Sequence, residues 1–195
     1  MANFGNKEIE IQVRIEKSKK LTAFLKKQAK FIGEEHQIDK YFTPTHRNFP
    51  KQRPTKEWLR LRDSSGKFSI NYKNWHYDKN GKSHYCDEYE TLVNELEQVD
   101  NIFKALDIKP ITIVDKLRKI YLFKNYEIAI DKVKDLGDFV EIEYKGKEKN
   151  KTPEKITEEM LKFLKDLDCG KIYRNYVGYP FQRLFPKEVK EEEIR

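Results

Sequence analysis

Two pairs of glutamates, one near the start of the chain and one far along it, stand at alternate positions. Glu8 and Glu10 lie in the stretch KEIEIQVRI, and Glu141 and Glu143 lie in DFVEIEY. Both pairs alternate with aliphatic residues, which is the period-two pattern of a β-strand with one apolar face. Carboxylates stacked on one side of a strand are either a solvated face or ligands for a divalent cation.

Basic residues repeat in the same way on other segments. Arg60 alternates with Arg62, Lys116 alternates with Arg118, and Lys73 ends a further alternating stretch. The two signs of charge are therefore separated by strand, whereas a solvated surface usually mixes them. Arginine and lysine are the side chains that hold phosphate oxygens. The pattern indicates an interior built for an anion that carries metal ions, and a sheet with one wet face is the alternative.

The strands that must position these residues are numerous and antiparallel. The patterning predicts eight of them, at about 7–15, 34–42, 57–63, 67–75, 83–93, 112–123, 126–133 and 138–146. Three helices are predicted, over about 18–32, 94–107 and 153–169. An eight-stranded sheet removes its exposed edges when it closes. We therefore predict an α+β fold, a closed eight-stranded antiparallel β-barrel with about three helices packed outside.

Composition limits the class of protein. The chain has 195 residues, a formal net charge of +7, and two cysteines that form no CxxC pair. This suits one domain over 1–195, with a core of about 7–180 and a tail over 181–195, and it excludes a disulfide framework or a cysteine-built zinc site. The chain has no apolar run of membrane-spanning length and its start lacks the apolar core of a signal peptide. A cytoplasmic protein with an anionic partner and no membrane association is expected.

Six segments in order resemble one known family. EIEIQ resembles the ExExK signature that opens the CYTH, or triphosphate tunnel, enzymes, and DKYF, WLRLRD, INYK, VDKLRKIY and IAIDKVKDLGDFVEIE resemble its later strands. The likeness covers about residues 7–145 and looks closest to the class IV adenylyl cyclase branch, which is related to thiamine triphosphatases. It implies a β-tunnel that binds a triphosphate together with Mg²⁺ or Mn²⁺.

The resemblance also assigns roles to particular residues. It implies that metal is held by Glu8, Glu10, Asp131, Glu141 and Glu143. It implies that phosphates are held by Gln12, Arg60, Arg62, Lys73, Lys116 and Arg118, of which Lys73, Lys116 and Arg118 are assigned the catalytic role.

The sequence departs from the family pattern at Gln12, where ExExK has lysine. Glutamine can donate a hydrogen bond to phosphate but brings no charge. Three consequences are open: Arg14 or Lys145 compensates, turnover is reduced, or the substrate differs.

Two reactions suit the same set of residues. A class IV cyclase converts ATP to cyclic AMP and pyrophosphate, whereas a triphosphatase hydrolyses the terminal phosphate of thiamine triphosphate, tripolyphosphate or a nucleoside triphosphate. Both depend on positioning and charge neutralisation. A catalytically silent triphosphate-binding module is the rival from a different class, and RNA binding through the basic loop around Arg47 and Arg53 is weaker still. The chain is expected to be a monomer or a homodimer.

Overall fold

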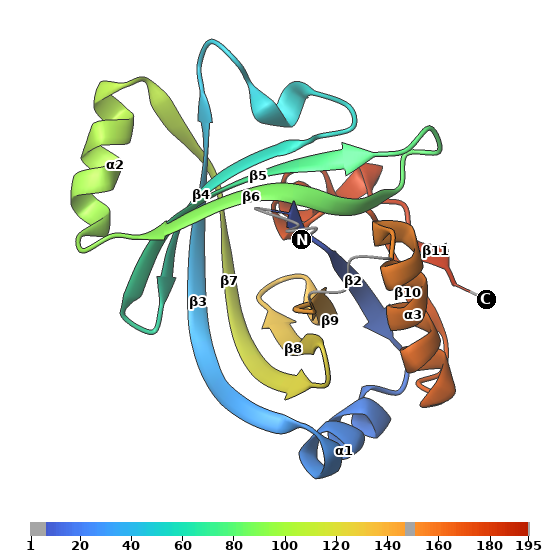
Figure 1. Ribbon diagram of the computed structural model, residues 1–195. Coiled ribbons are helices and arrows are strands. Elements are labelled where there is room, and N and C mark those ends of the chain that lie inside the picture. Colours follow the sequence, from blue (N-terminus) through green and yellow to red (C-terminus); the bar gives the residue numbers. More distant parts are fainter. Residues whose placement is uncertain (1–6, 147–150, 195) are drawn as a thin grey trace.

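The computed structural model describes residues 7–146 and 151–194, so parts of the predicted domain, at 1–6, 147–150 and 195, lie outside the described residues. One antiparallel sheet dominates the fold (Figure 1). Its strands are β1 (Lys7–Glu8), β2 (Glu10–Ile15), β3 (Lys30–Pro44), β4 (Glu57–Ser64), β5 (Lys67–Tyr77), β6 (Ser83–Leu92), β7 (Ile108–Phe123), β8 (Tyr126–Val133), β9 (Gly137–Tyr144), β10 (Ile172–Arg174) and β11 (Glu192–Glu193).

The hydrogen-bonded order of these described strands is β1-β6-β5-β4-β3-β7-β8-β9-β2-β10-β11. All eight predicted strands are present, and the first is divided at Ile9 into β1, which pairs with β6, and β2, which pairs with β9. The N-terminal segment thus contacts strands from both ends of the order. The order itself is open and has eleven members, so the closed eight-stranded barrel is not confirmed.

Four α-helices accompany the sheet in the described residues: α1 (Ser18–Gln28), α2 (Leu96–Ala105), α3 (Pro153–Asp166) and α4 (Tyr179–Leu184), with 3₁₀ turns at Phe49–Lys51 and Pro186–Glu188. The first helix ends earlier than predicted. Phe31 lies on β3, and its ring packs against the ring of Tyr121 with centroids 5.2 Å apart. Pairing with the long strand β7 therefore outweighs the helical spacing of these apolar residues.

Two helices cover the apolar face of the sheet beside β2 (Figure 1). Leu21 and Leu25 of α1 and Met160 and Leu164 of α3 are fully buried in a core that includes the aliphatic residues of β2 and β9. The N-terminus of α3 is capped, because the Thr152 side chain accepts a hydrogen bond from the amide of Lys155. These helices pack against the apolar face of β2, and its polar side chains lie on the opposite face.

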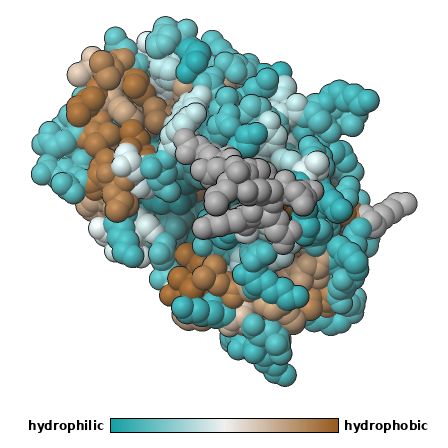
Figure 2. Space-filling model, in the orientation of Figure 1, coloured by the Kyte–Doolittle hydropathy of each residue, from teal (hydrophilic) through white to brown (hydrophobic). Residues whose placement is uncertain are grey.

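The second helix, α2, lies at the opposite end of the molecule from α3 (Figure 1). Phe103 fixes it through an edge-to-face contact with Phe42 of β3, whose ring centroid is 5.0 Å away. Other apolar residues here are exposed: Leu92, Ile102 and Leu106 are 78%, 55% and 64% accessible. Figure 2 shows a hydrophobic area at the place of α2. No helix in the described residues is both long and apolar enough to cross a membrane.

The tail returns to the sheet and is buried. Tyr179 and Phe181 of α4 pack into a core that also holds Trp58, Val114 and Phe139. The ring of Tyr179 lies 4.9 Å from that of Phe139, edge to face. The aromatic tail therefore belongs to the packed structure, and it supplies a fourth helix beyond the three predicted.

Candidate functional site

The concave face of the sheet encloses a cavity of about 230 Å³. Ten of the eleven predicted site residues line it: Glu8, Glu10, Gln12, Arg60, Arg62, Lys73, Lys116, Arg118, Glu141 and Glu143. Strand alternation places them on one face, and the register of neighbouring strands places them in rows. The exception is Asp131, which is fully buried and does not line this cavity.

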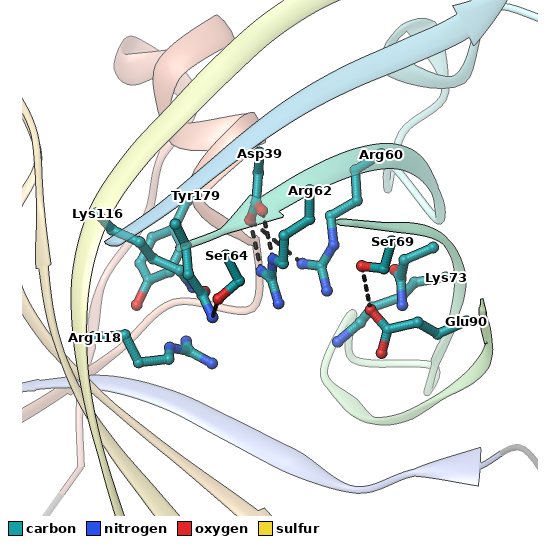
Figure 3. A network of polar contacts seen from close by, with 12 residues as sticks. Asp39, Arg60, Arg62, Ser64, Ser69, Lys73, Glu90, Lys116, Arg118 and Tyr179 are labelled. Carbon is teal, nitrogen blue, oxygen red and sulfur yellow. Dashed lines mark hydrogen bonds and ion pairs between the residues drawn. The ribbon is translucent and has the colours of Figure 1, made fainter. Parts of the chain in front are cut away.

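A buried aspartate on β3 orients the arginines of β4. Asp39 is 0% exposed and accepts two hydrogen bonds from Arg62, at 2.6 Å from Nε and 2.7 Å from Nη2. Arg60 Nη1 lies 3.6 Å from the same carboxylate. Burial alone would raise the pKa of Asp39, but Arg62 and Arg60 outweigh it and hold this pKa well below its usual range. Figure 3 shows both guanidinium groups reaching from β4 beside Asp39.

Asp131 on β8 plays the matching part for β7. It accepts hydrogen bonds from Arg118 Nε at 2.7 Å, Lys116 Nζ at 3.3 Å and the Tyr179 hydroxyl at 2.9 Å. Its oxygens are thus committed to three donors. This position, behind the bases and off the cavity, does not favour the metal-binding role that the resemblance implied for Asp131. In this structure Asp131 orients Lys116 and Arg118, and its implied metal-binding role stays a prediction.

Lys116 and Arg118 respond differently to burial. Burial and the neighbouring charge of Arg118 lower the pKa of Lys116 to about 8. Burial also opposes the charge of Arg118, but Asp131 and Glu141 outweigh it and raise the Arg118 pKa well above its usual range. In Figure 3 the ends of Lys116, Arg118 and Arg62 point into one space. An anionic ligand placed in this space, in addition to the Asp131 carboxylate, would favour the charged form of Lys116.

The opposite wall of the cavity is acidic. Glu10 of β2 stands directly across from Glu143 of β9, which stands directly across from Glu127 of β8. Like charges in directly opposed positions destabilise a sheet. Burial and the charge of Glu8 raise the pKa of Glu10 well above its usual value, and the same two causes raise that of Glu143 to about 7. The neighbouring positive charges therefore do not fully neutralise the row of Glu10, Glu143 and Glu127.

Two lysines partly neutralise this acidic wall. Lys73 of β5 forms an ion pair with Glu8 and lies 3.6 Å from Glu10 and 3.7 Å from Glu88. Burial would raise the pKa of Glu8, but Lys73 outweighs it and lowers this pKa. Lys145 pairs with Glu143 at 2.5 Å.

The donor chemistry of the acidic wall suits a hard divalent cation, because carboxylate oxygens are the ligands that Mg²⁺ and Mn²⁺ prefer. The four glutamates Glu8, Glu10, Glu141 and Glu143 line one cavity, and burial together with their mutual repulsion raises the pKa values of Glu10 and Glu143. Within residues 7–146 and 151–194, however, no three acidic, histidine or cysteine side chains converge closely enough to form a coordination sphere. The glutamates are turned toward Lys73, Lys145 and Arg118 instead.

Gln12 faces the cavity, and its side chain forms hydrogen bonds with two other protein side chains. Its Nε2 donates to Glu141 Oε1 at 2.9 Å, and its Oε1 accepts from Gln182 Nε2 of α4 at 3.1 Å. Both ends of the amide are therefore held. In this arrangement Gln12 orients Glu141, and one N–H of its amide donates to no residue in the described parts of the chain, so the phosphate-binding role that the resemblance implies for Gln12 stays a prediction.

The comparison with known protein families decides the classification. The model of the CYTH domain family matches residues 6–172, which contain every predicted site residue. The chain belongs to the CYTH domain family. A relative of this CYTH chain is a Methanocaldococcus jannaschii protein named "putative adenylate cyclase". The two sequences are 38% identical over 165 residues, which make up 84% of this chain and 91% of the relative.

Solved structures resemble the CYTH chain over most of its length. The PH1819 protein from Pyrococcus horikoshii OT3 matches with a TM-score of 0.74 and 27% identity, covering 93% of this chain and 99% of its own. A Hippeastrum protein, described as a "putative adenylyl cyclase" with a dominant triphosphatase activity, matches with a TM-score of 0.65 and 17% identity, covering 94% and 100%. At that identity the likeness to the Hippeastrum protein concerns the fold alone.

Three residues of this CYTH site were missed by sequence reasoning. Asp39 lies in the quoted DKYF segment but received no role, because nothing in the sequence says that it faces Arg60 and Arg62. Glu127 follows the same strand alternation as Asp131 and lines the cavity. Tyr179 packs in the core, and its hydroxyl also donates a hydrogen bond to Asp131.

Proposed function

We propose that this chain is a metal-dependent enzyme that acts on the triphosphate group of a small molecule, and that its reaction is that of a class IV adenylyl cyclase, ATP to cyclic AMP and pyrophosphate. The observation that carries the proposal is the division of one cavity into a basic wall and an acidic wall. Arg60, Arg62, Lys116 and Arg118 face an anion from one side, and the glutamates face a cation from the other.

The basic wall would bind the phosphates. Its guanidinium groups are held by Asp39 and Asp131 before any substrate arrives, so little orientational freedom is lost on binding. Arginines placed in this way stabilise the negative charge that shifts between phosphoryl oxygens during the reaction. Lys73 bridges the two walls and would contact substrate on release from Glu8.

The acidic wall would hold Mg²⁺ or Mn²⁺ through Glu8, Glu10, Glu141 and Glu143. A bound metal supplies charge neutralisation and orientation of phosphate oxygens. Gln12 holds one oxygen of Glu141 while Arg118 pairs with the other, and Lys145 would leave Glu143 when the cation enters.

One observation supports the cyclase, and a different one supports the triphosphatase. The 38% identical relative is named as an adenylate cyclase, which favours the cyclase. The cavity volume of about 230 Å³ lies below the roughly 300–1,000 Å³ of pockets that enclose drug-sized ligands. A volume of this size suits a compact polyphosphate, which favours a triphosphatase that acts on tripolyphosphate or on the phosphate end of thiamine triphosphate or a nucleotide.

The test is product analysis with the full-length protein. ATP, thiamine triphosphate and tripolyphosphate are each incubated with Mg²⁺ or Mn²⁺. Cyclic AMP with pyrophosphate identifies the cyclase, whereas orthophosphate with the diphosphate product identifies the hydrolase. Lys116→Met should lower kcat/KM by about 100-fold or more, and Lys119→Met, on the same strand but half exposed and paired with Glu34, should not. Absence of turnover with all three substrates would sink the enzyme proposal.

A further inference from the structure

Arg174 is a buried cation whose charge has no carboxylate partner. The residue ends β10, is 4% exposed, and forms no ion pair with any residue in the described parts of the chain. Its contacts are a hydrogen bond from Nη2 to the Ser83 carbonyl at 3.0 Å and the ring of Tyr176, whose centroid lies 4.4 Å from Cζ. Buried charges in proteins are normally paired, so this arrangement calls for an explanation.

The acidic groups that could neutralise Arg174 are engaged elsewhere. Glu192 stands opposite Arg174 on β11, but its carboxylate takes the ammonium of Lys82 at 2.8 Å and the hydroxyl of Tyr176 at 3.2 Å. Glu10 also acts on Arg174 through its charge, while its own pKa is raised well above the usual value by burial and by Glu8. Burial lowers the pKa of Arg174, yet a guanidinium remains charged at neutral pH.

Arg174 lies beside the functional site. It lines a small cavity of about 30 Å³, and four residues, Glu10, Gln12, Trp75 and Gly178, line both this cavity and the main one. The small cavity is about the size that one water molecule occupies, and so has room for a single oxygen atom of a ligand. Arg174 thus approaches the site from the side of Gln12.

The bases of the main cavity differ from Arg174 in one respect. Each of them is already paired with a carboxylate of the protein: Arg60 and Arg62 with Asp39, Lys73 with Glu8, Lys116 and Arg118 with Asp131, and Lys145 with Glu143. Arg174 can receive a phosphate without giving up an ion pair. Its direct partner on β2 is Val13, and it lines the same small cavity as the neighbouring Gln12, the one predicted phosphate ligand that has no charge and whose amide is held at both ends.

We propose that Arg174 is an anion-binding residue of this site, which holds a phosphoryl oxygen of the triphosphate from the side of Gln12 and supplies the positive charge that glutamine lacks. The inference rests on the proposed function, since it takes the triphosphate as the ligand. It adds a residue from β10 to a basic wall otherwise built from β4, β5 and β7.

The experiment measures tripolyphosphate binding by calorimetry in EDTA, with Arg174→Gln, Arg174→Lys and the control Arg183→Gln. Arg183 lies on α4, contacts Asp135 and lines neither cavity. Arg174→Gln should weaken binding by about 10- to 100-fold, the range of a lost hydrogen bond to a charged group. Arg174→Lys should retain more of the affinity, and Arg183→Gln all of it. Gln12→Lys in the Arg174→Gln background should restore affinity, because the charge returns to a residue that lines the same small cavity.

Three outcomes would overturn the inference. The first is that Arg174→Gln binds tripolyphosphate as tightly as the wild type. Equal losses of affinity in Arg174→Gln and Arg174→Lys, with equal falls in melting temperature, would reduce the role of Arg174 to its contact with Ser83. A failure of Gln12→Lys to restore binding would remove the claim that both positions serve the same phosphate. Wild-type protein that binds tripolyphosphate neither in EDTA nor with Mn²⁺ would instead overturn the proposed function itself, together with this inference.

Discussion

The two walls of the cavity are prepared in opposite ways. Behind the basic wall, Asp39 and Asp131 are fully buried and neutralise the bases that they orient. In the acidic wall, Glu10, Glu143 and Glu127 oppose one another across neighbouring strands, and two of their pKa values are raised. The basic wall is thus complete without a ligand, whereas the acidic wall carries repulsion that a cation would relieve.

This difference indicates that the acidic wall depends on a bound ligand for its stability, whereas the basic wall does not. A preformed basic wall can select phosphate by its geometry, because the arginines are already in place. A repulsive acidic wall gains stability when a metal binds, and so couples metal binding to folding. Substitutions in the two walls should therefore change the stability of the metal-free protein in opposite directions.

The largest effect is expected for Asp39→Asn. The change leaves the buried guanidinium groups of Arg60 and Arg62 without a carboxylate, so the free energy of unfolding should fall by about 3–5 kcal/mol. Urea denaturation measures it. Asp135→Asn is the matched control, since Asp135 is two-thirds exposed beside Arg183 and should cost less than about 1 kcal/mol. Similar small losses in both variants would show that the basic wall does not depend on Asp39.

Glu10→Gln should act in the other direction on the metal-free protein. Removing one charge from the opposed row should raise the free energy of unfolding in EDTA by up to about 1 kcal/mol. The same change should weaken Mn²⁺ binding, measured by calorimetry, by about tenfold or more. Glu34→Gln, at a half-exposed site paired with Lys119, is the control for both measurements. A destabilised Glu10→Gln protein with unchanged Mn²⁺ affinity would contradict the repulsion in the acidic wall.

Metal affinity should depend on pH through Glu143. Its pKa in the metal-free protein is about 7, raised by burial and Glu8, so below pH 7 a proton must leave before a cation binds. Affinity for Mn²⁺ should rise about tenfold from pH 6 to pH 8, which follows from the ionised fraction of one such group. Glu143→Gln should bind Mn²⁺ more weakly and flatten this dependence. A flat profile in the wild type would place Glu143 outside the metal site.

The smallest effect is expected for the pH dependence of anion binding at the basic wall. Affinity should fall as pH rises, opposite to the pH dependence of metal binding. Lys116 is charged below its pKa of about 8 and loses its proton above it, because burial and Arg118 disfavour the ammonium form. Tripolyphosphate affinity in EDTA should therefore fall a few-fold as pH rises from 7 to 9. Lys116→Arg, which stays charged, should remove the fall. Equal pH dependence in both proteins would mean that Lys116 does not contact the anion.

Much of this site could be predicted from the sequence, because strand alternation assigns side chains to faces without knowledge of the rest of the fold. Glu8 and Glu10 were placed on one face, as were Arg60 and Arg62, and all four line the cavity. The order of the motifs was enough to identify the family, which the CYTH model confirms. The eight long strands were found by the same reasoning.

The pairing of the site residues could not be predicted, because it depends on strand register and on the packing of the C-terminal segment against the sheet. Alternation says which face a residue occupies but not which residue lies opposite, so it could not show that Glu143 meets Glu10 and Glu127. It also could not show that Asp131 turns behind Lys116 and Arg118, that Gln182 of the tail holds Gln12, or that Arg174 comes beside it. These contacts join segments far apart in sequence, and long-range pairing determines them. The sequence by itself determined the strands, their charged faces and the family, since those follow from local periodicity. Only the tertiary structure decided which charges are paired and which are left for a ligand, because the energy of a buried charge depends on what surrounds it in space.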